Sequence, residues 1–95
     1  MGDAQRLRSA AQRVIDLVHD DDLIYLDALP YRVQIELSTP LAMMGEVLEE
    51  GGSDGELRRA VDILHSAAAL VRAELPEELA GLLEELRFAG RAARS

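Results

Sequence analysis

The stretch DGELRRAVDILHSAAALVRAEL, residues 54–75, places apolar side chains four, three, four, three and four residues apart. Apolar residues at this spacing fall on one side of an α-helix and form a seam along which helices pack. The seam consists of Leu57, Val61, Leu64, Ala68, Val71 and Leu75. The spacing predicts one helix over residues 54–75, packed along its seam either in the core of the chain or against a second copy.

A second apolar stripe flanks the seam on the same predicted helix. It consists of Ala60, Ile63, Ala67 and Leu70. A helix that is apolar over so wide an arc buries more than one side. We therefore expect other parts of the protein to cover this helix on two sides.

The remaining sequence also predicts helices and no strands. Pro30 and Pro76 suit the first turn of a helix, where the missing N–H has no partner to lose. Gly51-Gly52 suits a helix end, and Ser53 or Asp54 suits the cap of the next helix. These signals predict helices over residues 3–19, 23–29, 30–50 with a bend near residue 40, 54–75 and 76–90. The expected fold is a single all-α domain, residues 1–95, resembling a helical hairpin or four-helix bundle and forming a dimer.

Composition excludes several classes of function. The 95 residues suffice for one modest core, and the 48% apolar content is typical of a globular domain. No apolar run is long enough to cross a membrane. The net charge is −8, with twelve acids against three Arg in residues 14–62, which argues against nucleic-acid binding. The chain has no Cys, and we expect a cytoplasmic protein.

Residues 35–41, IELSTPL, contain a Pro within a segment that otherwise predicts a helix. Pro in a helix interior removes one hydrogen bond, so it bends the helix or marks a boundary between two helices. The segment resembles the H-box of sensor histidine kinases, whose core reads His-Glu-Leu-Arg-Thr-Pro-Leu. The matching positions are Glu36, Leu37, Thr39, Pro40 and Leu41.

The resemblance extends over about residues 30–75, with Gly51-Gly52-Ser53 at the place of the family's hairpin loop. In that family two antiparallel helices form a hairpin, and two hairpins form a dimeric four-helix bundle. Ile35 stands at the position of the phosphorylated His and has no nucleophilic nitrogen. The resemblance therefore implies a degenerate domain that retains the homodimer and a partner-docking surface, with a response regulator or a kinase as the partner. Candidate partner-binding residues are Ile35, Glu36, Thr39 and Pro40.

The position of Ile35 on its helix is informative by itself. Ile35 lies two residues from both Val33 and Leu37, which belong to the expected buried stripe. At about 100° per residue, Ile35 points away from that stripe. Ile35 is therefore either exposed or covered by the first and last helices.

His65 suggests a competing phosphorelay hypothesis. The run His65-Ser66-Ala67-Ala68-Ala69-Leu70 faintly resembles the histidine-containing phosphotransfer domain. That family has a Lys and a Gly three and four residues after the His, where this chain has Ala68 and Ala69. His65 is otherwise expected to be a helix-rim His that titrates near pH 6.5.

No other residues predict a catalytic, cofactor or metal site. A metal site needs at least three converging ligands, and His19 has only the acidic run 20–22 beside it. Adjacent Glu residues point about 100° apart on a helix and do not form an acid–base pair. The leading hypothesis is a non-enzymatic regulatory or adaptor domain that is a homodimer and binds a protein partner. The alternatives are a phosphotransfer protein that uses His65 and a monomeric death-fold-like recruitment domain with a Greek-key helix arrangement.

Overall fold

The protein is all-helical, as predicted, in a computed structural model that describes residues 2–18 and 29–94. The described part contains four α-helices and one short 3₁₀ helix. These are α1 (Asp3–Val18), α2 (Tyr31–Glu50), α3 (Asp54–Leu70), the 3₁₀ helix η2 (Arg72–Glu74) and α4 (Glu77–Arg94). The predicted helix over residues 23–29 lies outside the described residues except for Leu29, which forms a buried bend.

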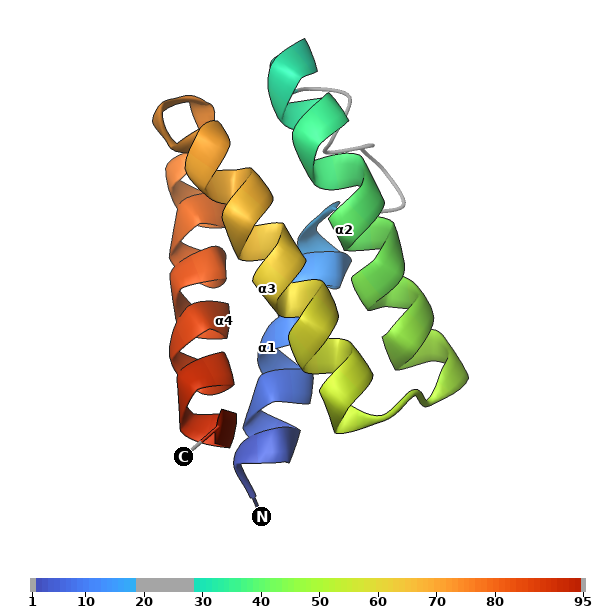
Figure 1. Cartoon of the computed structure of the whole chain (residues 1–95). Helices are drawn as coiled ribbons and strands as arrows, with labels where there is room; N and C mark the ends of the chain where they lie inside the picture. The colour runs from blue at the N-terminus through green and yellow to red at the C-terminus, as the bar shows by residue number, and fades with distance from the viewer. Residues whose placement is uncertain (1, 19–28, 95) are drawn as a thin grey trace.

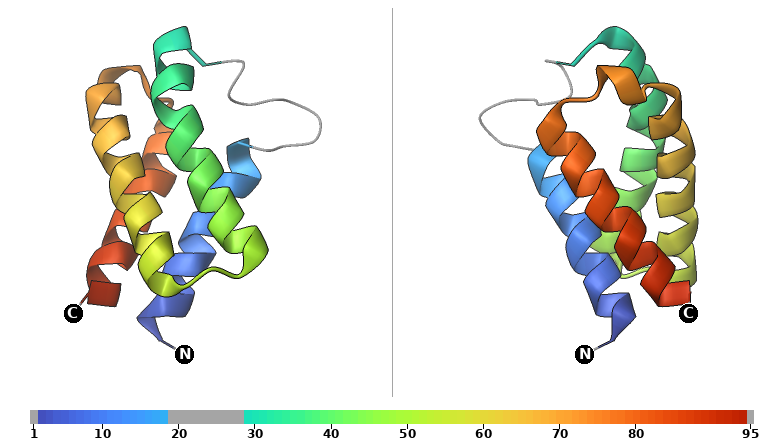
Figure 2. Two further views of the ribbon diagram at one scale, coloured as in Figure 1. Left: turned by 45° about the vertical axis from the view of Figure 1, so that its right-hand side comes forward. Right: turned by 90° about the vertical axis from the view of Figure 1, so that its left-hand side faces the viewer.

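The four α-helices alternate in direction around a bundle (Figures 1 and 2). The N- and C-termini consequently lie at the same end of the bundle (Figure 1). Packing is most extensive between α2 and α3 and between α1 and α4, and sparser between α1 and α2 and between α3 and α4. The bundle therefore consists of two antiparallel pairs, the α2–α3 hairpin and the pair formed by the first and last helices.

Pro30 and Pro76 were each predicted to be the first residue of a helix, but each lies one residue before the helix begins. Pro30 is the N-cap of α2, and its carbonyl accepts the first helical hydrogen bond, from the N–H of Gln34 at 3.1 Å. The carbonyl of Pro76 likewise accepts from the N–H of Ala80 at 2.9 Å, and α4 begins at Glu77. Such shifts of one residue fall within the usual uncertainty of helix ends. α4 continues to Arg94, four residues beyond the predicted end at residue 90.

The helix predicted over residues 54–75 ends earlier, because α3 stops at Leu70. After it, the N–H groups of Val71, Glu74 and Leu75 donate to carbonyls three residues back, which tightens the chain into η2. Leu75 is extended, with ψ 135°. The cause is Pro76, because the proline ring disfavours the α conformation in the preceding residue.

α2 is continuous across Pro40, so Pro40 does not mark a boundary between two helices. Pro40 has no N–H to donate to the carbonyl of Glu36, and one helical hydrogen bond is lost there. Two residues before Pro40, the hydroxyl of Ser38 donates to the carbonyl of Gln34. Pro40 itself is buried in the core, so burial of its ring offsets part of the cost of the missing hydrogen bond.

The seam of α3 lies in the core of this single chain. Leu57, Val61, Leu64, Ala68 and Val71 are buried, and Leu75 is half-buried against the same cluster. Among the described residues the core contains no buried polar or charged side chain. The sensor-kinase resemblance implies that a second copy covers the hairpin, whereas here α1 and α4 of the same chain cover it. The seam is thus core, and a dimer is not needed to bury it.

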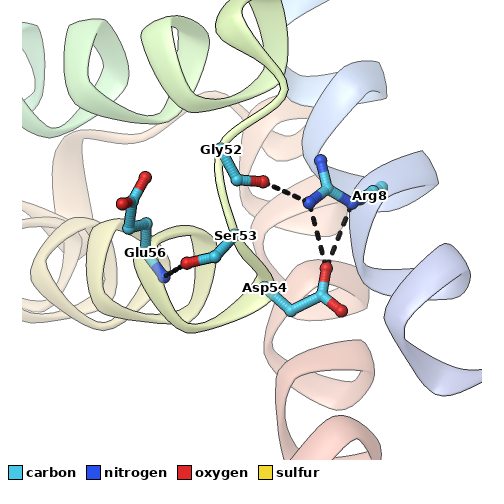
Figure 3. A network of polar contacts seen from close by, with 5 residues as sticks. All are labelled: Arg8, Gly52, Ser53, Asp54 and Glu56. Carbon is cyan, nitrogen blue, oxygen red and sulfur yellow. Dashed lines mark hydrogen bonds and ion pairs between the residues drawn. The ribbon is translucent and has the colours of Figure 1, made fainter.

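The turn between α2 and α3 is fixed by local caps and by one contact from α1 (Figure 3). Gly51 ends α2 in the left-handed conformation, with φ 69°. The Ser53 hydroxyl caps α3 by accepting from the N–H of Glu56 at 3.2 Å. From α1, Arg8 donates to the Gly52 carbonyl at 2.5 Å and pairs with Asp54 at 3.0 Å. Arg8 therefore ties the α2–α3 turn to the other helix pair.

Candidate functional site

The four predicted partner-binding residues occupy three different environments on α2. Ile35 is 55% exposed, and Thr39 is also exposed. Glu36 is half-buried. Pro40 is buried because it shares the inner face of α2 with Leu37 and Met44, so its assignment as a partner-contact residue is corrected. Ile35 and Thr39, four residues apart, remain together on the outer side of the helix.

The second stripe of α3 is only partly covered, in contrast to the expectation of cover on two sides. Ala60 is buried and Ala67 is half-buried, but Ile63 and Leu70 are 39% and 61% exposed. Ile63 and Leu70 are seven residues apart, which places both on the same side of α3. Their exposure leaves an apolar strip along the helix.

Contacts with the neighbouring helices show where this strip lies. Val61 faces α4, since a Cβ built on Gly90 would lie 3.9 Å from its Cγ1. The strip of Ile63 and Leu70 is on the opposite flank of α3 and therefore borders α2. On α2, Gly45 faces Ile15 of α1, so the flank toward α3 is on the far side from Gly45.

The apolar strip of α3 therefore lies on the outside of the α2–α3 pair. We call this surface the hairpin face and define it by Ile63 and Leu70 of α3. Ile35 is four residues from Tyr31 and seven from Ala42, so it shares a side of α2 with these two residues and lies apart from the hairpin face. Two further large apolar side chains in the described part are exposed elsewhere. Tyr31 lies at the start of α2, and Phe88 points outward from α4. The sequence alone predicted no binding site at either residue.

His65 lies beside a small pocket between α3, η2 and α4. The pocket has a volume of about 130 Å³ and an apolar wall made by Ala68, Leu75 and Leu83. Its charged lining residues are Arg72, Arg87 and Glu84. Its size is close to that of cavities that accept one small organic molecule.

The imidazole of His65 differs from an ordinary rim His. Its Nε2 is covered and has no hydrogen-bond partner among the described residues. Burial lowers the pKa of His65 below its ordinary value of 6.5, and the positive charge of Arg87 lowers it further. Asp62 and Glu84 oppose this shift without reversing it. His65 is therefore neutral at pH 7, and the prediction that it titrates near 6.5 is corrected.

The lowered pKa predicts a pH-dependent contribution to stability. The unfolded chain binds a proton at a higher pH than the folded chain, so protonation favours unfolding. The contribution of His65 is fully present above about pH 6.5 and is lost as the pH falls through the lower pKa of the folded state. We expect the free energy of unfolding to fall less between about pH 7.5 and pH 5.5 in His65→Gln than in the wild type. Urea denaturation at both pH values measures this, and equal falls in the two proteins would contradict it.

The geometry of His65 gives little support to a role as phosphoacceptor. A nucleophilic nitrogen must reach the phosphorus atom of its donor. The Nε2 of His65 is covered by protein. Arg87 adds a positive charge near the ring, and the neighbouring Ala68 and Ala69 provide no further cation.

Within residues 2–18 and 29–94, no group of three or more potential metal ligands converges. No helix in the same ranges combines the length and the apolar character needed to cross a membrane.

The chain was also compared with known proteins. No protein-family model, no curated protein and no solved structure matches it.

Proposed function

We propose that this protein is a non-enzymatic regulatory or adaptor domain that binds other proteins through the hairpin face. The observation that carries the proposal is the exposure of Ile63 and Leu70 on one side of α3. Exposed apolar side chains gathered on one surface are typical of protein–protein interaction sites.

A second copy of the chain is the first partner that we propose for the hairpin face. The seam of α3 is already buried, so a homodimer would form through residues outside the core. A two-fold axis at this face would bring Ile63 and Leu70 of both copies together, as in an isologous interface. A cytoplasmic signalling role, with a response regulator or kinase as a further partner, follows only from the H-box resemblance of residues 35–41.

No observation favours the two alternatives, the death-fold-like recruitment domain and the phosphotransfer protein that uses His65. A Greek-key recruitment domain requires helices that cross between layers, whereas the described helices alternate in direction around the bundle (Figure 2). Phosphotransfer through His65 requires an accessible Nε2, which is covered. The adaptor hypothesis requires only the exposed apolar surface.

Light scattering coupled to size-exclusion chromatography tests the homodimer. At tens of micromolar the wild type is expected at twice the chain mass of 10.4 kDa. Ile63→Asp/Leu70→Asp should give a single-chain mass, because two desolvated carboxylates would oppose the interface. Phe88→Asp is the matched control, because Phe88 is 67% exposed on α4, and this variant should remain dimeric. A wild type of single-chain mass at these concentrations would refute the homodimer.

A further inference from the structure

A second surface, separate from the hairpin face, lies in the groove between α1 and α2. The groove has a volume of about 490 Å³. Its apolar floor is formed by Ile15 of α1 and by Ala42, Gly45 and Leu48 of α2. The groove exists because α1 and α2 pack sparsely along their length.

Two residues on the floor of the groove, Ala42 and Gly45, are small, and they leave room for an incoming side chain or backbone. Ala42 is exposed and Gly45 is half-buried. The fold itself does not require Gly45, since an added Cβ would meet only the Cδ1 of Ile15, at an ordinary distance of 3.7 Å. Gly in a helix interior is less stable than Ala by about 0.5–1 kcal/mol. A small residue at this position permits the close approach of another backbone.

The rim of the groove is acidic and unpaired. Glu46 and Glu49 line it from α2, and neither has an ion-pair partner within residues 2–18 and 29–94. On α1, Gln12 lines the rim and donates to Asp16 at 2.9 Å. The neighbouring cation Arg8 is bonded to Asp54 and Gly52 instead. The groove therefore presents uncompensated negative charge above an apolar floor.

This charge decides between the possible occupants. A second copy of the chain that packed groove to groove would bring its own Glu46 and Glu49 to the interface, and like charges at an interface oppose association. A helix with Arg or Lys beside its apolar side would instead pair with Glu46 and Glu49. These two carboxylates are three residues apart and share one side of α2, so cations three or four residues apart on the incoming helix can reach both.

The side of α2 that lines the groove continues beyond the groove toward the start of the helix. Tyr31, Ser38, Ala42, Gly45 and Glu49 recur at seven, four, three and four residues, so they share one side. Tyr31 is 76% exposed and offers an aromatic contact at the end remote from Glu49. At 1.5 Å per residue this side of α2 is about 27 Å long, which is long enough for five turns of a partner helix.

We propose that the α1–α2 groove binds a basic amphipathic helix of a partner protein, with its cations at Glu46 and Glu49 and its apolar side on Ala42 and Gly45. The proposal rests on the proposed role as an interaction domain and names the chemistry of the partner. It uses a surface that does not include Ile63 or Leu70 of α3. Homodimer formation and helix binding can therefore be tested separately.

The probe is a synthetic amphipathic helix with Leu and Ala on one side and Arg pairs three and four residues apart beside them. Its binding to the full chain is measured by isothermal titration calorimetry. The control peptide has Glu in place of each Arg. We expect the basic peptide to bind and the acidic peptide to bind at least about tenfold more weakly.

Two protein variants locate the binding site. Glu46→Arg/Glu49→Arg should weaken binding of the basic peptide at least about tenfold and permit binding of the acidic peptide. Ala42→Trp should weaken binding without a change of charge, because the ring fills the floor of the groove from an exposed position. The charge-matched control Glu74→Arg/Glu78→Arg, at exposed positions on η2 and α4, should bind the basic peptide like the wild type.

Failure of this proposal and failure of the homodimer give different results. Absence of binding by the basic peptide, or equal weakening by the groove variants and by Glu74→Arg/Glu78→Arg, would overturn the groove proposal. Ile63→Asp/Leu70→Asp should bind the peptide as the wild type does, whatever its oligomeric state. Loss of peptide binding in that variant would place the peptide on the hairpin face and also refute the groove.

Discussion

Replacing Leu64 by Ala is expected to lower the free energy of unfolding by about 2–5 kcal/mol. Leu64 is fully buried in the middle of the α3 seam, so the substitution leaves a cavity and removes apolar contacts. Urea denaturation followed by circular dichroism measures the loss. The expected loss is large relative to the stability of a typical domain, about 5–15 kcal/mol.

Leu70→Ala provides the matched control, with the same chemical change in the same helix. Leu70 is 61% exposed, and its truncation should change the stability by no more than about 0.5 kcal/mol at protein concentrations low enough for the chain to be monomeric. The loss caused by Leu64→Ala should also be independent of protein concentration, because the seam lies in the core of one chain. A loss that grew on dilution would show instead that the seam is an interface between copies.

Gly51→Ala is expected to destabilise the protein by about 1–2 kcal/mol, because a residue with a Cβ is strained in the left-handed conformation. Gly51 has φ 69°, and its N–H caps α2 by donating to the carbonyl of Val47. No atom within 4 Å would contact an added Cβ, so the cost is conformational and not steric crowding by neighbours. Thermal and urea unfolding measure it.

Replacing Gly81 by Ala should have the opposite effect on stability. Gly81 lies within α4, is exposed and has open space around an added Cβ. Gly81→Ala should therefore stabilise the protein by about 0.5–1 kcal/mol through the better helix propensity of Ala. A destabilising effect at Gly81, or a neutral effect at Gly51, would contradict the roles given to these two glycines.

Local signals in the sequence predicted most of the secondary structure. The four-three spacing of residues 57–71 identifies a helix and its buried side, and Gly51 marks the end of α2 because the left-handed conformation needed there favours glycine. The prediction failed at Leu75, where the apolar spacing suggested continued helix. Pro76 was the stronger signal, because it acts on the backbone of the preceding residue directly.

Features that depend on neighbouring helices were not predictable from spacing. Ala60 and Ile63 belong to the same apolar stripe in the sequence, yet Ala60 is buried and Ile63 stays exposed, because the placement of the other helices decides which of them is covered. The contact from Arg8 to Gly52 joins residues 44 positions apart and has no local motif. The pKa of His65 likewise depends on Arg87 of α4, which sequence spacing does not place beside it.

The pairing of α1 with α4 has a consequence for how the chain folds during synthesis. The α2–α3 hairpin joins neighbouring segments and can form as soon as both have left the ribosome, because its loop is short. α1 is made before α2 and α3, but its principal packing partner, α4, follows them in the sequence. The buried side of α1, with Leu7, Val14 and Val18, therefore stays incompletely covered until α4 has been synthesised. During that interval the nascent chain exposes this apolar side, which makes α1 a segment that a chaperone would bind.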